Sequence, residues 1–318
     1  MSSLRSLRKR LRRRWKHKPG PIPWLLYQPT RLLLALLNVL PISWLYAIGA
    51  AGGRLAWLFS RRRRAGRFQI ALAFPELSAS QRDHILKQSC ATLGRSAAEV
   101  LFYSDRLRGA MDGRLLFEDG AEPLLRGAAG KGAVLVQAHL GSFETGGAGM
   151  GLLGLNPAFP MRLPNNYYLG ERLKRSREGW GVTLLPRRGA VRLMMRHLRN
   201  GDSVVLASDQ NAHQAPIFVP WFGHLAATER AAAAIALKMG APLLVFWCLR
   251  NKTIGSWTIG CQQLLEGGTK QIATDQAVYD LNVRIHTCLE EVIRRAPEQY
   301  LWIHDRYRTR PPGENLDS

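Results

Sequence analysis

The apolar positions change their spacing along the chain, and this change predicts the architecture. Residues 78–102 begin with Ser and Gln, which suit a helix cap, and continue with apolar residues at helical spacing. Residues 132–140, 203–208 and 242–249 are instead short, nearly continuous apolar runs bounded by Gly, Asp or Pro. Such runs are typical of strands that are buried on both faces of a parallel sheet.

Helical patterns lie between these predicted strands, at residues 169–180, 190–198 and 228–239. Strands that alternate with helices indicate an α/β fold with a largely parallel central sheet flanked by helices. In such a sheet the site forms beyond the carboxyl ends of the strands. Two candidate residues stand there, since His139 follows the first apolar run and Asp209 follows the second.

The N-terminal part of the chain has another pattern. Residues 1–20 are strongly basic, residues 32–59 are almost entirely apolar, and four arginines follow at 61–64. A basic cluster beside an apolar stretch is the pattern expected at an anionic lipid surface. The sequence therefore predicts an N-terminal helical membrane anchor.

This reading divides the chain into three parts, which are a basic tail at 1–23, an anchoring segment at 24–60 and a catalytic domain at 61–318. The apolar run is long enough to cross a bilayer, but it is basic at both ends and contains Pro41, which would kink or split a helix. A bent helical pair in the inner leaflet and a crossing helix both fit, and a buried core helix is the third alternative. A signal peptide is disfavoured because no small-residue cleavage pattern follows.

The charge of the chain supports this division. The 318 residues include 45 Lys and Arg against 23 Asp and Glu, for a net charge of +22. Of the basic residues, 16 precede Glu76, which is the first acidic residue, so the rest of the chain carries only +6. A nucleic-acid enzyme with a basic cleft is therefore not favoured. The hydrophobic content of 46% is ample for a core and excludes a disordered or fibrous chain.

The four cysteines are widely separated: Cys90, Cys248, Cys261 and Cys288. They lack the paired spacing of a zinc site or a redox motif, so we expect reduced structural thiols. His213 and His224 belong to no metal-binding motif. The sequence therefore predicts neither a metal nor a cofactor.

The segment AHLGSFETGG places His139 and Glu144 five positions apart across a turn that contains Gly141. If a helix starts near Ser142, Glu144 lies in its first turn and can face the imidazole. A carboxylate there would fix the tautomer and leave the other ring nitrogen as a general base. By spacing alone, a packing role for the histidine is the main alternative. Ser142 lacks the context of a nucleophile elbow, which favours direct attack by a substrate hydroxyl.

The box HLGSFE at the end of an apolar strand resembles the signature of the lysophospholipid acyltransferase superfamily. Three further segments are similar to the bacterial lipid A biosynthesis acyltransferases, the lauroyl and myristoyl transferase branch. They are FQIALAFPELSASQRDHIL at 68–86, SDQN at 208–211 with FVPWFG at 218–223, and PEQYLWIHDRYRTRPPGE at 297–314. The resemblance thus runs from the anchor almost to the end of the chain.

The resemblance implies a glycerolipid acyltransferase-like fold without a cofactor. It also implies transfer of an acyl chain from acyl carrier protein, or from coenzyme A, to a hydroxyl of a phosphorylated glycolipid at the cytoplasmic face of a bacterial inner membrane. Matched motif by motif, His139 is the base that deprotonates this hydroxyl and Glu144 is its partner, while Asp209 is the acidic residue of the second block. The family's arginine between the boxes is Arg177, or its rival Arg175.

The basic residues around these two arginines can meet acceptor phosphates or an acidic carrier protein, although a solvated helix face is their plain alternative. Two other functions remain open from the sequence. One is acylation of a lysophospholipid or of another glycolipid, and the other is a non-catalytic membrane lipid-binding protein. A nucleic-acid-binding protein would show steep salt dependence.

Overall fold

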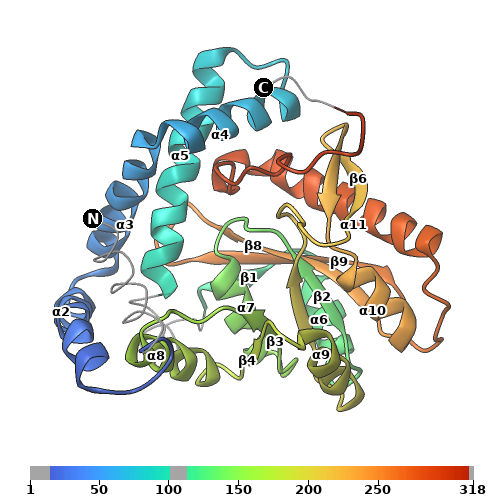
Figure 1. Cartoon of the computed structure of the whole chain (residues 1–318), viewed down its shortest axis with the longest axis horizontal. Helices are drawn as coiled ribbons and strands as arrows, with labels where there is room; N and C mark the ends of the chain where they lie inside the picture. The colour runs from blue at the N-terminus through green and yellow to red at the C-terminus, as the bar shows by residue number, and fades with distance from the viewer. Residues whose placement is uncertain (1–14, 101–112, 315–318) are drawn as a thin grey trace, which may run out of the picture.

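The computed structural model describes residues 15–100 and 113–314 (Figure 1). At its centre is a seven-stranded sheet of order β1-β9-β8-β2-β5-β3-β4. Its strands are β1 (Leu115–Phe117), β2 (Val134–Gln137), β3 (Ala158–Met161), β4 (Thr183–Pro186), β5 (Val204–Ala207), β8 (Leu243–Arg250) and β9 (Trp257–Leu265). All neighbouring pairs are parallel except β8 and β9. The predicted α/β fold with a largely parallel sheet is confirmed.

The three predicted apolar runs form the centre of this sheet. They become β2, β5 and β8, and β2 pairs with both of the others. Every residue of β2 is buried, as a strand between two layers must be. Because β2 and β5 are parallel and adjacent, their carboxyl ends meet at one edge of the sheet.

Helices cover both faces of the sheet. The helices of the body are α5 (Ala79–Ala98), α6 (Ala121–Ala128), α7 (Phe143–Leu152), α8 (Tyr167–Glu178), α9 (Ala190–Arg199), α10 (Ala231–Met239), α11 (Asp275–Arg295) and the short η3 (Pro297–Gln299). Successive residues of a strand point to opposite faces. Val134 accordingly belongs to the core under α9, α10 and α11, whereas Leu135 belongs to the core under α6 and α7.

The predicted helices differ from the observed ones mainly at their ends. The capping box expected at the start of the first helix is present, with Ser78 and Gln81 bonded reciprocally. The helix predicted at 228–239 starts later, at Ala231, because residues before it form a hairpin of β6 (Ile217–Trp221) and β7 (His224–Thr228). A two-residue turn with positive φ joins these strands, and the phenylalanine in it gave no turn signal.

The N-terminal segment is a series of helices rather than one. It comprises α2 (Pro21–Asn38), α3 (Ile42–Arg54), η1 (Leu55–Leu58) and α4 (Ser60–Ala73). Pro41 is the N-cap of α3, so the chain breaks where the sequence predicted. Across the described ranges, 15–100 and 113–314, we find no helix with the length and apolar character that a membrane crossing requires.

Helix α3 packs against α5 at very close range. A Cβ atom on Gly94 of α5 would lie 1.8 Å from the carbonyl oxygen of Gly49 and 2.7 Å from the nitrogen of Gly53. Leu45, Tyr46 and Ala50 of α3 are buried. This helix is therefore part of the packed body of the protein.

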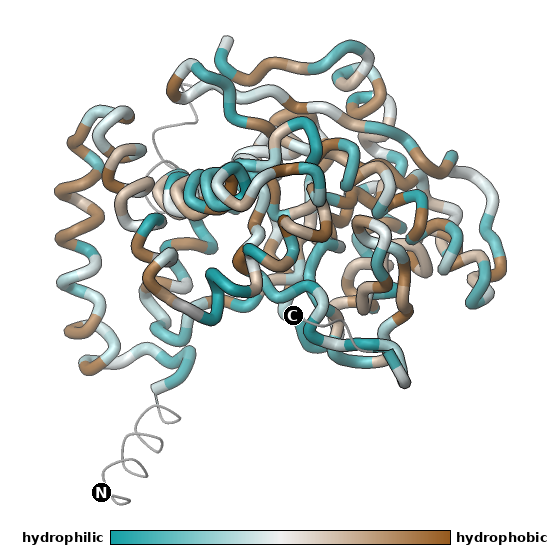
Figure 2. The backbone as a smooth tube through the Cα atoms, turned by 90° about the horizontal axis from the view of Figure 1, so that it is seen from above, coloured by the Kyte–Doolittle hydropathy of each residue, from teal (hydrophilic) through white to brown (hydrophobic). Residues whose placement is uncertain are grey.

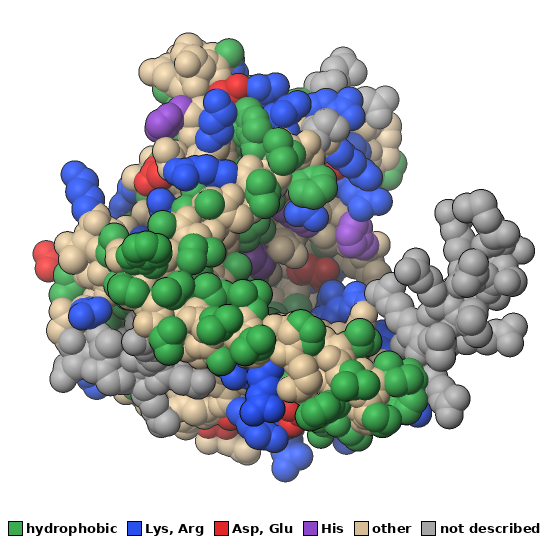
Figure 3. All heavy atoms as spheres, turned by 90° about the vertical axis from the view of Figure 1, so that its left-hand side faces the viewer, with side chains coloured by type: hydrophobic (Ala, Val, Ile, Leu, Met, Phe, Trp, Pro, Cys, Tyr) green, Lys and Arg blue, Asp and Glu red, His purple; other side chains and the backbone are tan. Residues whose placement is uncertain are grey.

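Helix α2 behaves differently, since it lies at the edge of the molecule with apolar residues along its length (Figure 2). Most of its large apolar side chains are exposed, among them Leu25 at 61% and Leu26 at 70%, whereas Leu34 is buried. Trp44 of α3 and Phe59 before α4 are exposed as well. Figure 3 faces this side, where apolar side chains cover much of the surface and Lys and Arg side chains gather beside them.

Candidate active site

His139 and Asp209 meet at the carboxyl ends of β2 and β5. The last paired residues of these strands are Gln137 and Ala207, so each candidate follows its strand by two residues. The Nδ1 atom of His139 lies 2.8 Å from Oδ1 of Asp209, and the backbone N–H of His139 donates to Oδ2 at 2.9 Å. Both oxygens of a buried carboxylate therefore hold the same histidine.

The charges of this pair support each other. Burial lowers the pKa of His139, but the negative charge and hydrogen bond of Asp209 outweigh burial, helped by the charge of Glu144, and the pKa is raised. Burial likewise raises the pKa of Asp209, but His139 outweighs it and the pKa is lowered. An ionised carboxylate only accepts hydrogen bonds, so Nδ1 carries a proton. In the neutral ring Nε2 then carries the lone pair, and it accepts a hydrogen bond from the side-chain nitrogen of Gln210 at 3.3 Å.

Glu144 is not a hydrogen-bond partner of the imidazole, contrary to the expectation from spacing, since Asp209 and Gln210 are the partners of the ring nitrogens. It lies in the first turn of α7, as predicted, but it forms a two-point ion pair with Arg177 of α8. The distances are 2.9 Å from NH2 to Oε1 and 3.1 Å from Nε to Oε2. The physical reason is that Asp209, just after the neighbouring strand β5, already occupies the Nδ1 side of the ring.

The geometry of α8 decides which of the two candidate arginines, Arg175 or Arg177, lies at the site. Residues two apart on a helix point in nearly opposite directions. The side chain of Arg177 is 11% exposed and faces Glu144, whereas Arg175 is exposed. Only the first of them lines the cavity beside His139.

That cavity has a volume of about 200 Å³ and mostly apolar walls. His139, Glu144 and Arg177 lie along it, and its apolar lining includes Phe143, Ala148, Phe159, Met161, Trp180, Val182, Leu184 and Val205. Small residues of α7 provide part of the space. A Cβ on Gly147 would lie 2.7 Å from the ring of Phe159. The glycine-rich sequence after the box was the available signal for this cavity, and the sequence reasoning did not use it.

The C-terminal segment, residues 297–314, forms hydrogen bonds to the loops that carry His139 and Asp209. The backbone N–H of Leu301 donates to the carbonyl of His139 at 3.1 Å. Arg306 is fully buried and donates to the carbonyl of Gln210 at 3.1 Å, while His304 Nε2 accepts the backbone N–H of Asn211 at the same distance. The segment that resembled a family signature thus holds both active-site loops in place.

The start of α7 offers a second chemical feature. The first N–H groups of a helix have no intrahelical acceptor, and the helix dipole favours negative charge there. The N-cap residue, Ser142, makes no side-chain cap hydrogen bond. Phe143, Glu144 and Thr145 of this first turn line the cavity. An oxyanion that forms in the cavity can therefore be stabilised by this backbone.

Metal ligands do not gather in the part of the chain that the structure describes, where no three His, Cys, Asp or Glu side chains are placed to hold an ion. All four cysteines are free thiols, as expected.

Comparison with known proteins identifies the family. Residues 21–309 match the model of the family described as bacterial lipid A biosynthesis acyltransferase. The chain is 29% identical over 284 residues to the lipid A biosynthesis palmitoleoyltransferase of Escherichia coli (strain K12), and the matched region covers 87% of this chain and 89% of the relative. It is 27% identical over 292 residues to the lipid A biosynthesis lauroyltransferase of the same organism, and this match covers 88% of this chain and 90% of the relative. The chain therefore belongs to the bacterial lipid A biosynthesis acyltransferase family, and it is an acyltransferase.

Proposed function

We propose that this enzyme moves a fatty acyl chain from the thioester of acyl carrier protein to a hydroxyl of a phosphorylated lipid A precursor, with His139 as the general base. The observation that carries this proposal is the His139–Asp209 pair, whose ring lies at an apolar cavity. A base beside an apolar cavity suits a reaction between a hydroxyl and a long-chain thioester.

In the proposed reaction Nε2 of His139 takes the proton of the acceptor hydroxyl as its oxygen attacks the thioester carbonyl carbon. Asp209 stabilises the imidazolium that forms. The tetrahedral oxyanion is stabilised by the N–H groups at the start of α7. The carbon–sulfur bond then breaks, the carbonyl is restored as an ester, and the proton on Nε2 passes to the departing thiolate.

The remaining predicted site residues have supporting roles in this proposal. Glu144 holds the guanidinium of Arg177 at the cavity and adds negative charge near the imidazole. Arg177 binds the substrate at the cavity, and its two-point contact fixes its orientation. Arg175 is exposed on α8, where it can meet an acidic carrier protein. The acyl chain lies in the apolar cavity.

We also propose that the enzyme works at the cytoplasmic face of the inner membrane. The exposed apolar side chains of α2, with Trp44 and Phe59, would enter the interface, and the arginines at 61–64 would meet anionic head groups. The division into tail, anchor and catalytic domain stays a prediction. Replacing Leu25 and Leu26 by Glu should reduce cosedimentation with anionic vesicles, and unchanged binding would contradict this orientation.

The reaction is tested with the purified enzyme, one acyl chain and a matrix of donors and acceptors. The donors are acyl carrier protein and coenzyme A thioesters, and the acceptors are a lipid A precursor and a lysophospholipid. We expect mass spectrometry to find one added acyl chain on the lipid A precursor, with the carrier protein as the better donor. Acylation of the lysophospholipid alone would overturn the proposed acceptor. Faster transfer from the coenzyme A thioester than from the carrier protein thioester would overturn the proposed donor.

A further inference from the structure

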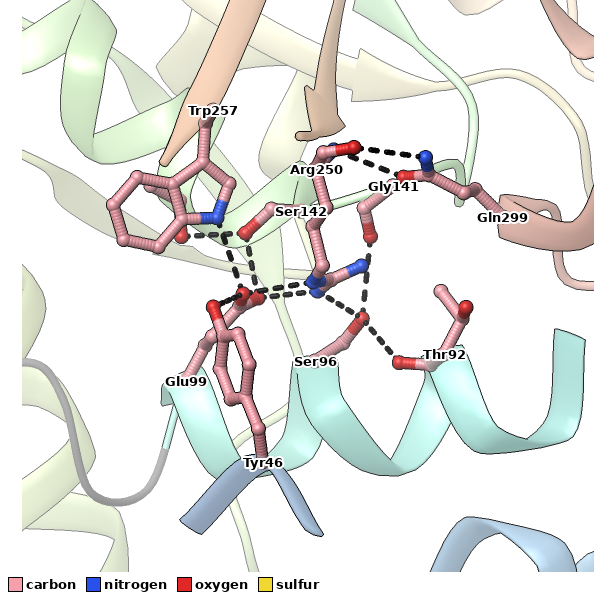
Figure 4. A network of polar contacts seen from close by, with 10 residues as sticks. Tyr46, Thr92, Ser96, Glu99, Gly141, Ser142, Arg250, Trp257 and Gln299 are labelled. Carbon is pink, nitrogen blue, oxygen red and sulfur yellow. Dashed lines mark hydrogen bonds and ion pairs between the residues drawn. The ribbon is translucent and has the colours of Figure 1, made fainter. Parts of the chain in front are cut away.

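A buried carboxylate lies behind the turn that precedes α7 (Figure 4). Glu99, the residue at which α5 ends, is 3% exposed and accepts five hydrogen bonds. Its Oε1 accepts from the hydroxyl of Tyr46 at 2.5 Å, from Nε of Arg250 at 2.8 Å and from Nε1 of Trp257 at 3.2 Å. Its Oε2 accepts from the hydroxyl of Ser142 at 2.5 Å and from NH2 of Arg250.

These donors come from separate parts of the fold. Tyr46 lies on α3, Arg250 ends β8, Trp257 begins β9, and Ser142 lies in the turn between His139 and Glu144. A buried carboxylate is costly unless charged and polar partners surround it. Five hydrogen bonds surround the carboxylate of Glu99, so its position relative to Ser142 is strongly restrained.

The position of Ser142 is unusual for a serine that precedes a helix. A serine at the N-cap normally accepts a hydrogen bond from an N–H of the first turn. The hydroxyl of Ser142 makes no such bond. The single hydroxyl proton of Ser142 is donated to Glu99. The hydroxyl of Thr145 lies 2.6 Å from that of Ser142, so Thr145 donates and the Ser142 oxygen accepts. Glu99 thus anchors the hydroxyl of Ser142, and this hydroxyl does not cap the first turn of α7.

The backbone of the same turn is fixed as well. The N–H of Gly141 donates to the carbonyl of Gln299 at 2.9 Å, and the N–H of Ser142 donates to the carbonyl of Cys248 at 2.7 Å. The carbonyl of Gly141 accepts from the hydroxyl of Ser96, which in turn accepts from NH2 of Arg250 at 2.8 Å. The turn is thus held by backbone bonds on one side and by the Glu99–Arg250 pair on the other.

We propose that Glu99 is a positioning residue for acyl transfer. Held by Arg250, it anchors the hydroxyl of Ser142 and with it the turn before α7, so that the N–H groups at the start of this helix are held facing the carbonyl oxygen of the thioester. The inference rests on the proposed function and adds a residue that acts through Ser142 rather than on the reacting atoms.

The test removes single partners of the carboxylate, because Glu99→Gln would leave the charge of Arg250 buried and unpaired. The two variants are Ser142→Ala and Tyr46→Phe. Their control is Ser203→Ala, at an equally buried serine whose hydroxyl has no partner among the described residues. All are compared in kcat, in KM for the acyl donor and in thermal unfolding.

We expect Ser142→Ala to lower kcat by about tenfold or more and Tyr46→Phe to lower it by about threefold, with KM changed by less than about twofold. The control should keep kcat within about twofold, even if its melting temperature falls as far as those of the two test variants. If Ser142→Ala and Tyr46→Phe lose no more kcat than Ser203→Ala while His139→Ala is inactive, the inference fails and the proposed function stands. If His139→Ala stays active, the proposed function itself fails.

Discussion

His139 and Asp209 lie just beyond the carboxyl ends of neighbouring strands, and the carboxylate contacts both the ring and the backbone of the histidine, at 2.8 and 2.9 Å. Two contacts fix the ring more tightly than one, because they define its orientation as well as its distance. They also fix the tautomer, with the proton on Nδ1 and the lone pair on Nε2. The parallel pairing of β2 and β5 therefore brings Asp209 to His139 and orients the imidazole as a base.

The first prediction concerns Asp209→Asn. An amide cannot stabilise the imidazolium and can favour the wrong tautomer, so we expect kcat to fall by about three orders of magnitude or more. The pKa of His139 should also fall, because burial still lowers it while the charge that raised it is gone.

A pH profile of kcat/KM checks the sign of this effect. In the wild type the activity should be lost on acidification through a pKa above the ordinary value of 6.5. In Asp209→Asn the residual activity should persist to lower pH, since the imidazole stays neutral there. An acid limb at the same pH in both proteins would refute the pairing as the cause of the raised pKa.

The second prediction separates the two arginines of α8. Lysine cannot reproduce the two-point contact of Arg177 with Glu144. We expect Arg177→Lys to lower kcat/KM by about tenfold to a hundredfold and Arg175→Lys to change it by less than about twofold with a small thioester donor. A larger loss in the Arg175 variant would reverse the assignment.

The third prediction concerns the length of the acyl chain. Ala148 lines the cavity one helical turn beyond Glu144, and leucine there would add three carbons to the wall. A methylene that no longer fits costs about 1–3 kcal/mol, so Ala148→Leu should shift the preference toward shorter chains by about tenfold or more. The control is Ala97→Leu at an exposed position of α5. Competition between donors of different length measures the ratio, and an equal ratio in both variants would argue against this cavity as the acyl site.

The fourth prediction tests the contact of α3 with α5. Gly94→Ala would force a Cβ against the backbone of Gly49, so we expect a loss of about 1–3 kcal/mol in the free energy of unfolding. A Cβ on Gly52 of α3 would have no atom within 4 Å, and Gly52→Ala should stabilise this helix by about 0.5–1 kcal/mol. Denaturant unfolding compares the two, and equal effects would mean that α3 is not packed as described.

The sequence predicted those parts of the fold that have a strong local signal. The strands β2, β5 and β8 were visible because they are buried on both faces and therefore uniformly apolar. In contrast, β1 has only three residues, β4 is partly exposed, and β9 carries exposed glutamines near its end. The hairpin of β6 and β7 was missed because its turn contains Phe222 where a second glycine or an asparagine would have been a clear signal.

The candidate site divides in the same way. The strand-end positions of His139 and Asp209 followed from the pattern, but their contact depends on which strands are neighbours, and 70 residues separate them. Spacing therefore favoured Glu144, which is nearer in sequence. The Glu99–Arg250 pair spans 151 residues and has no motif, so only the folded chain reveals it.

The central claim is tested most directly by the acyl transfer rate of His139→Ala, measured with acyl carrier protein thioester and lipid A precursor. Circular dichroism and thermal unfolding establish that the variant is folded. The account predicts that kcat falls by at least about three orders of magnitude while the fold is retained. A folded His139→Ala enzyme with a rate near that of the wild type would contradict it.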